Sequence, residues 1–409
     1  MFKTQIINDP VHGFITISEP LILKIIDHPV FQRLRKIKQL GLTELVYPGA
    51  VHSRFQHALG AMHLMRMALQ TLTEKGHHIS KDECEGALIA ILLHDSGHGP
   101  FSHILENVLV PGIRHEKISW LVMKKLNTVF HGKLSIAISI FSNQYPKKFL
   151  HQLVSSQLDV DRMDYLARDS FFTGVAEGII SYDRIIKMMN VVNDRLVIEE
   201  KGMYSIEKFL IARRLMYWQV YLHKTVHSAS EMLTKILKRA KELLSSGNQL
   251  PGHPSLIHLL DSTISTRNFM KQEMPLENFL SLDDNDVWSA VKCWQDFPDT
   301  ILSLLCKNLA NRNLFKIELS ETPFSKNQLT KLNRLIQKKY AITPSQTSYF
   351  VFTDYISNHA YFEKQDNINI LMKSGRVLDV SKATGLWNLK ALDKEVRKYF
   401  LCHIKNLYK

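Results

Sequence analysis

The most constraining feature of this sequence is a short apolar run that ends in two adjacent polar residues. Residues 87–93 read Ala-Leu-Ile-Ala-Ile-Leu-Leu, and His94 and Asp95 follow at once. Ala87, Ile91 and His94 recur at helical spacing, and the pattern Ser80-Lys-Asp-Glu resembles a helix cap, so we predict a buried helix over 81–94. A buried carboxylate is costly unless it is paired or bound to a metal. The His-Asp pair therefore indicates a polar site inside a helical core.

The rest of the chain also favours a mainly α protein. Helical patterns recur at residues 30–40, 56–73, 117–125, 147–167, 207–223 and 228–244. Strand-like runs occur at residues 314–319, 349–353 and 368–372, a short hairpin is expected at 196–204 around Lys201-Gly202, and a final helix at 391–406. Residues 245–255 (SSGNQLPGHPS) form the best linker candidate. We predict a helical core over residues 1–250, followed by a smaller α+β lobe over residues 251–409.

The charge balance favours an anionic partner. The 409 residues include 52 Lys and Arg against 39 Asp and Glu, a net charge of +13. Such an excess suits a polyphosphate or a nucleic acid, and it does not distinguish between them. The four cysteines are far apart and contain no C-x-x-C pair, which argues against a cysteine-built zinc site. With no long apolar stretch in residues 1–8 and none long enough to cross a bilayer, we expect a cytoplasmic protein without membrane segments.

Three places concentrate the residue types that bind metals. The first is His57 in the pattern SRFQH, the second is HDSGHGPFSH from residue 94 to 103, and the third is DVDRMDY from residue 159 to 165. Each has an ordinary alternative: a lone histidine is usually structural, His94-Asp95 could be a helix C-terminus with a turn at Gly97, and Asp161 could simply cap a helix or pair with Arg162. Together they offer imidazole and carboxylate ligands that suit first-row divalent metals such as Fe, Mn, Zn or Ni.

At this point the sequence resembles a known family. The order H…HD…D is similar to the HD superfamily of metal-dependent phosphohydrolases. Five stretches resemble its deoxynucleoside triphosphate (dNTP) triphosphohydrolase branch, which includes the sterile-alpha-motif and HD-domain enzymes and shorter bacterial relatives. These stretches are INDPVHG (7–13), FQRLRKIKQLG (31–41), YPGAVHSRFQHALG (47–60), LLHDSGHGPFSH (92–103) and LDVDRMDYLARD (158–169). The resemblance implies an HD-domain helical bundle and hydrolysis of a dNTP to deoxynucleoside and inorganic triphosphate.

The resemblance also assigns roles to single residues. It implies that the metal ligands are His57, His94, Asp95 and Asp161, with Mg²⁺ accompanying the substrate phosphates. The substrate contacts it implies are Gln39 and Leu40 at the deoxyribose, Arg54 at a phosphate, and Arg162, Tyr165, Asp169 and Arg213 at phosphates and sugar. Tyr217 stands on the base side, where some members carry histidine. The polar group around the scissile bond would be His98, His103, Glu106 and His115.

The chemistry expected of that polar group is proton transfer to the leaving oxygen. Histidine suits this role because its pKa lies near neutral pH. His103 and Glu106 are three residues apart and would share a face if the segment is helical, so we favour Glu106 orienting His103 as the acid. His115 is the second candidate.

Regulation and assembly are also implied by the resemblance. Asp27, Gln32 and Arg35 match the contacts of a regulatory guanine nucleotide, although Gln5 replaces a lysine there, and a homo-oligomer (dimer or tetramer) is expected. The alternative for these basic residues is a solvated face formed by Arg33, Arg35 and Lys36. Two other functions stay open: hydrolysis of another phosphoester, such as a nucleoside monophosphate or cyclic nucleotide, and non-catalytic binding of nucleic acid.

Overall fold

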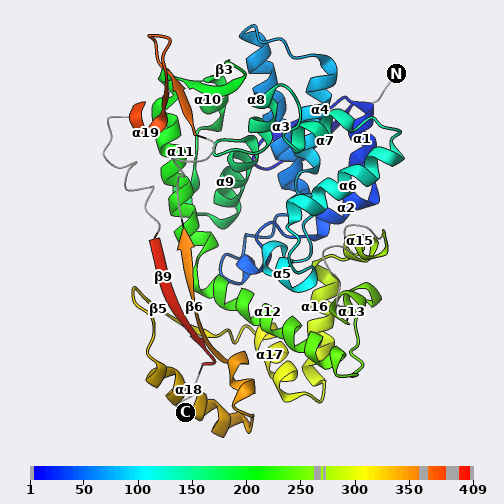
Figure 1. The fold of residues 1–409 in the computed structure, drawn as a ribbon, viewed down its shortest axis with the longest axis vertical. Coiled ribbons are helices and arrows are strands. Elements are labelled where there is room, and N and C mark those ends of the chain that lie inside the picture. The colour runs from blue at the N-terminus through cyan, green and yellow to red at the C-terminus, as the bar shows by residue number, and fades with distance from the viewer. Residues whose placement is uncertain (1–3, 262–268, 270–272, 359–366, 384–395, 406–409) are drawn as a thin grey trace.

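The structure is a computed structural model that describes residues 4–261, 269, 273–358, 367–383 and 396–405. A helical body formed by the first half of the chain occupies the upper part of Figure 1, and most of the later elements lie below it. The mainly α fold with a smaller C-terminal α+β part is confirmed. Among the described residues, no helix is both long and apolar enough to cross a membrane.

Three helices form the centre of the upper body. They are α3 (Arg54–Glu74), α4 (Lys81–Leu93) and α9 (Val160–Thr173), and α3 packs against both of the others. Ser53 and Ser80 begin α3 and α4 with complete capping boxes, so backbone N–H groups that a helix start leaves free are satisfied there. The helices predicted at 56–73 and 81–94 are thereby confirmed.

The remaining helices surround this centre or build the lower part. Before residue 250 they are α1 (Pro20–Asp27), α2 (Pro29–Gln32), α5 (Glu106–Leu109), α6 (His115–Val129), α7 (Ser135–Phe141), α8 (Lys148–Val154), α10 (Tyr182–Lys187), α11 (Met203–Met216) and α12 (Lys224–Ser245). After residue 250 they are α13 (Pro254–Asp261), α15 (Glu273–Leu280), α16 (Asp284–Cys293), α17 (Thr300–Ala310), α18 (Lys326–Tyr340) and α19 (Val380–Ala383).

Three small sheets complete the fold. A hairpin pairs β1 (Gln5–Asp9) with β2 (Gly13–Ile17). The second sheet has the order β3 (Met189–Val192), β4 (Arg195–Glu199), β7 (Asn369–Leu371), β8 (Val377–Asp379). The third has the order β5 (Lys316–Ser320), β9 (Val396–His403), β6 (Val351–Asn358). Because β7 pairs in parallel with β4, a late segment of the chain returns to the upper body (Figure 1).

The helix predicted at 30–40 is wrong beyond its first turns. The helix α2 is followed by a 3₁₀ turn at Arg33–Lys36, and Ile37 is extended. Backbone bonds to a neighbouring segment replace the helical ones: Gln39 N donates to His52 O and Arg54 N donates to Ile37 O, both at 2.9 Å. The chain therefore lies along the segment before α3 instead of coiling.

Two later predictions are also wrong. The hairpin turns at Asn193 and Asp194, both with positive φ, and not at Lys201-Gly202. The helix predicted at 391–406 is the strand β9 over its described part, with β5 and β6 on either side. Two backbone ladders and the burial of Phe400 and Leu401 outweigh the helical spacing of apolar residues in this segment.

Candidate active site

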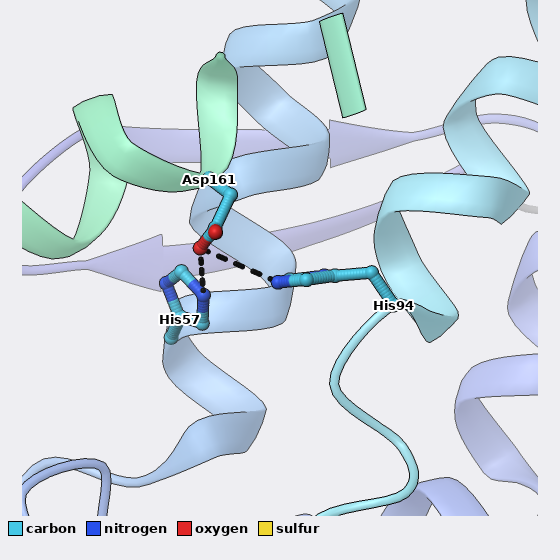
Figure 2. A group of neighbouring side chains, drawn as sticks. All are labelled: His57, His94 and Asp161. Atoms are coloured by element: carbon cyan, nitrogen blue, oxygen red, sulfur yellow. Dashed lines mark ion pairs between the residues drawn. The ribbon is translucent and has the colours of Figure 1, made fainter. Parts of the chain in front are cut away.

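Two histidines and two aspartates meet where the three central helices converge. His57 comes from α3, His94 ends α4, and Asp161 lies in the first turn of α9 (Figure 2). Asp161 Oδ1 is 3.0 Å from His57 Nε2 and 3.3 Å from His94 Nε2. Asp95 lies beside them, with its Oδ1 3.3 Å from His94 Nε2 and its Oδ2 3.7 Å from His57 Nε2. The four side chains that the sequence predicts as ligands are thus brought together.

The donor atoms of this cluster fit a divalent metal. Both Nε2 atoms are buried, and neither makes a hydrogen bond of ordinary geometry within the described part of the chain. The opposite ring nitrogens are occupied: His94 Nδ1 lies 2.6 Å from Ile91 O and His57 Nδ1 lies 2.8 Å from Asp164 Oδ2. Such partners fix the tautomer and orient the free nitrogen of a ligating histidine.

Electrostatics favour positive charge at the same place. Burial would lower the pKa of His57, but the Asp161 and Asp164 carboxylates outweigh it and raise that pKa to about 10. The surrounding carboxylates thus favour positive charge at this place. A metal ion would supply that charge, as ligand histidines bind metals in the neutral form.

Asp164 holds His57 of this cluster in place through its carboxylate. Its carboxylate contacts His57, His12 (2.6 Å to Nε2) and Arg168 (2.9 Å to Nε), and Arg168 also donates to Asp9 at 2.8 Å. Gly60 of α3 leaves the room for this: a Cβ there would lie 2.0 Å from Asp164 Oδ1. Sequence reasoning missed these roles, although the residues lie in the two stretches DPVHG and MDYLARD.

An arginine lies directly on the candidate ligands. Arg54 is buried, its Nη1 donates to Asp95 Oδ2, and its Nε donates to Ser102 Oγ at 2.8 Å. The cation predicted to hold a phosphate is therefore fixed next to the candidate metal ligands. Arg162 is on α9, where its Nε donates to Ser156 O at 2.7 Å and its Nη1 to the Tyr165 hydroxyl at 3.4 Å.

Two more histidines extend the site. The rings of His98 and His115 stack at 3.9 Å, and His98 Nε2 is 3.3 Å from Asp95 Oδ1. Burial and the Arg54 cation hold the pKa of His98 well below its usual range, so its ring is neutral at neutral pH. Glu106 Oε1 accepts from the His115 backbone N–H at 2.7 Å and lies 3.2 Å from its Nδ1. The side chain of His103 lies outside the described residues, so its predicted pairing with Glu106 stays a prediction.

The residues predicted for sugar and base form a second group. Asp169 accepts hydrogen bonds from the Tyr221 hydroxyl and pairs with His52 Nε2, both at 2.7 Å. The ring of Tyr221 contacts those of Tyr165 (6.2 Å) and Tyr217 (5.1 Å) edge to face. His52 was not predicted, and only its place in the stretch AVHSRFQH could have suggested it.

Two further predicted contacts have buried polar atoms without a hydrogen-bond partner in the described part of the chain. Gln39 Oε1 has no hydrogen-bond partner in the described chain, and the same holds for Nε and Nη1 of Arg213. Unpaired buried polar atoms are rare, and a ligand is one standard reason for them. Leu40, next to Gln39, is half-buried against the main hydrophobic core.

The residues predicted for a regulatory nucleotide are at the surface. Arg35 Nε donates to Gln32 Oε1 at 2.8 Å, and its guanidinium lies 3.6 Å from the centre of the Phe55 ring. Asp27 is exposed at the end of α1, next to Ile26, whose carbonyl accepts from Gln32. Arg33, by contrast, is buried and does not belong to a solvated face.

This arrangement defines a class of protein. A paired His-Asp at the end of one helix, a histidine from a second and an aspartate from a third follow the order H…HD…D, and three of these residues, His57, His94 and Asp161, form a group that could hold a metal ion. The HD domain family matches residues 54–169 and the HD-associated region matches residues 180–249. The chain belongs to the HD-domain phosphohydrolase family.

Relatives of known sequence or structure support this membership. The uncharacterised protein YwfO of Bacillus subtilis is 34% identical over 398 residues, 94% of this chain and 88% of that protein. A crystal structure of a phosphohydrolase from Bacteroides thetaiotaomicron is 51% identical, with a TM-score of 0.95 over 98% of this chain and all of that one. The deoxynucleoside triphosphate triphosphohydrolase SAMHD1 homologue of Dictyostelium discoideum is 30% identical over 336 residues, which are 77% of this chain and 60% of that protein.

Proposed function

We propose that this protein hydrolyses deoxynucleoside triphosphates to deoxynucleoside and inorganic triphosphate. The observation that carries the proposal is the buried contact of Arg54 with Asp95, inside the cluster of His57, His94 and Asp161. It sets a phosphate-binding cation directly beside the candidate metal ligands. The name of the Dictyostelium relative supports the choice of substrate.

His57, His94, Asp95 and Asp161 would hold a divalent metal ion such as Fe, Mn, Zn or Ni. When bound, this ion lowers the pKa of a water molecule and draws charge from a phosphoryl oxygen. Asp164 and Ile91 keep the ligand nitrogens of His57 and His94 turned toward it.

The remaining steps belong to the chain's own side chains. Arg54 and Arg162 would neutralise phosphate oxygens, because a guanidinium can donate two parallel hydrogen bonds to one phosphate. His115, held by Glu106, and His103 are the candidates that give a proton to the leaving oxygen. His98, neutral in its buried position, can donate a hydrogen bond without repelling the arginines.

We assign the nucleoside to the group around Asp169. Gln39 and Leu40 would lie against the deoxyribose and leave no room for a 2′-hydroxyl, while Tyr165, Asp169 and Arg213 would contact sugar and phosphates. Tyr217 would face the base. The free buried atoms of Gln39 and Arg213 support these contacts.

Assembly and regulation complete the proposal. We propose a cytoplasmic homo-oligomer, and a nucleotide activator that contacts Asp27, Gln32 and Arg35. Mg²⁺ would enter with the substrate phosphates. We also propose that the chain divides into two domains at residue 250.

The deciding experiment is product analysis. Purified protein is incubated with each dNTP and each ribonucleotide, with Mn²⁺ or Mg²⁺, and with or without GTP and a second dNTP. We expect deoxynucleoside and intact triphosphate from dNTPs and little turnover of ribonucleotides. Release of single phosphates, or hydrolysis restricted to monophosphates or cyclic nucleotides, would contradict the proposal and indicate another HD phosphoester reaction.

A further inference from the structure

The loop that carries His98 contains an unfavourable bend. After α4 the chain runs through Gly97, His98 and Gly99 to Phe101 and Ser102, which have φ of 53° and 55°. This left-handed region is disfavoured for residues with a Cβ. Neither residue is glycine, so contacts that stabilise the bend offset a backbone cost.

Asp284 supplies such a contact from the second half of the chain. It lies in the first turn of α16 and is buried. Its Oδ1 accepts from Phe101 N at 2.7 Å, and its Oδ2 accepts from Lys38 N at 2.9 Å. Asp284 is not the cap of α16, because Asp283 performs that role by accepting from Asn285 N. Its carboxylate is thus used entirely to join two distant backbone segments.

Arg33 provides a second contact between the same regions. Its Nε donates to Leu282 O at 2.8 Å and its Nη2 donates to His98 O at 2.5 Å. One buried guanidinium therefore joins the residue two positions before Asp284 to the backbone of a candidate catalytic histidine. Removing the Arg33 side chain would be costly, since it would leave two buried carbonyl groups without their hydrogen-bond donor.

Both joined segments carry candidate active-site residues. Lys38 directly precedes Gln39, and its carbonyl accepts from Ser102 Oγ at 3.3 Å. The same Ser102 hydroxyl accepts from Arg54 Nε at 2.8 Å. A shift of the bend would therefore move the hydroxyl that orients Arg54, in addition to the backbone of His98.

We propose that Asp284 and Arg33 are positioning residues for this hydrolase, which fix the loop 96–102 and with it His98 and Arg54. Their hydrogen bonds reach the backbone of the loop and, for Asp284, also the backbone of Lys38, so they act through these two segments. The inference rests on the proposed function for the reaction, and on the contacts above for the loop.

The first test compares variants of the full chain in turnover and metal content. Asp284→Ala removes both acceptors, Asp284→Asn keeps one, and Asp283→Asn removes a charge from the same helix start while preserving the cap. We expect kcat to fall by about 10–100-fold in Asp284→Ala, by less in Asp284→Asn, and not in Asp283→Asn, because small misplacements of catalytic groups have effects of this size. Bound metal should be unchanged in all three.

The second test measures the loop directly, without reference to any substrate. Hydrogen–deuterium exchange of peptides that cover residues 96–103 should be about tenfold faster in Asp284→Ala than in wild type, with α4 unaffected. Arg33→Lys, a milder change that keeps the charge, should show the same pattern if Asp284→Ala does not fold.

These readouts separate the two proposals. Unchanged exchange in the loop, or a loosened loop with full kcat, would overturn the positioning role. If the wild-type protein leaves dNTPs intact, the proposed substrate is wrong. Faster exchange of the loop in Asp284→Ala would still show that Asp284 fixes the loop.

Discussion

At the scale of single residues, the candidate site depends on side chains that hold the candidate ligands in position by hydrogen bonds. Asp164 contacts His57, His12 and Arg168 at once, and each contact restricts where the imidazole of His57 can turn. Partners of this kind commonly affect metal affinity 10–100-fold. The sequence reveals the candidate ligands because their residue types are unusual in a buried helix. It does not reveal Asp164 or Asp284, because an aspartate in a polar stretch has many ordinary uses.

The ligand assignment makes a direct prediction. His94→Ala and Asp161→Ala each remove one donor from a four-residue set, so bound transition metal and turnover should both be lost. Elemental analysis of the purified variants and the product assay measure the two effects. Lys338→Ala, on the exposed face of α18, is the control and should retain both. Full metal content with normal activity in either ligand variant would refute the assignment.

For Gly60→Ala, the sign of the change in the free energy of unfolding tests how tightly Asp164 and Arg168 pack against α3. Alanine is favoured over glycine inside a helix by about 1 kcal/mol, so Gly60→Ala would stabilise α3 if space were available. A Cβ would instead lie 2.0 Å from Asp164 Oδ1 and 2.2 Å from Arg168 Nη2. We expect a loss of about 1–3 kcal/mol in denaturant unfolding and a lower metal content. A more stable variant would show that the Asp164 contacts are not as tight as described.

At the scale of elements, sequence patterns succeed where local signals and tertiary contacts agree. The helices α3 and α4 begin with capping boxes and bury much of their surface, and the helical spacing, together with the cap at Ser80 for α4, was enough to predict them. The strand β9 could not, because its apolar residues also fit a helix and its two partner strands are 38 or more residues away in sequence. The extended segment before α3 was missed for the same reason, since its backbone partners are not local.

The end of α18 allows a test of local backbone strain. Ala341 follows the helix with φ of 52°, a conformation in which glycine is preferred. Ala341→Gly should raise the free energy of unfolding by about 1 kcal/mol. Ala310→Gly is the matched control: that residue is also exposed and ends α17 in helical geometry, so the change should be destabilising. Equal effects of the two substitutions would contradict the left-handed assignment.

At the scale of the whole molecule, both hydrophobic cores draw on both halves of the chain. Ile368, Ile370 and Val380 are buried in the core formed by α3, α4 and α9. Conversely, Leu42 and Phe101 are buried in the core that surrounds α12 and α17. The pairing of β4 with β7 adds backbone bonds between the same halves. The site therefore depends on contacts across residue 250, where we place the domain division.

This arrangement predicts how a divided chain behaves. Residues 1–250 alone lack Asp284, Leu282 and the strand β7, and they expose core residues that the later segments cover. We expect this fragment to lack a cooperative thermal transition and to bind no metal. Co-expression with residues 251–409 should restore both, because the missing contacts are non-covalent. Calorimetry of the fragment and of the co-expressed pair measures the thermal transition, and elemental analysis measures the bound metal. A fragment that unfolds cooperatively and retains metal would instead show that residues 1–250 are an independent folding unit, and that the later half of the chain adjusts the active site without being needed to form it.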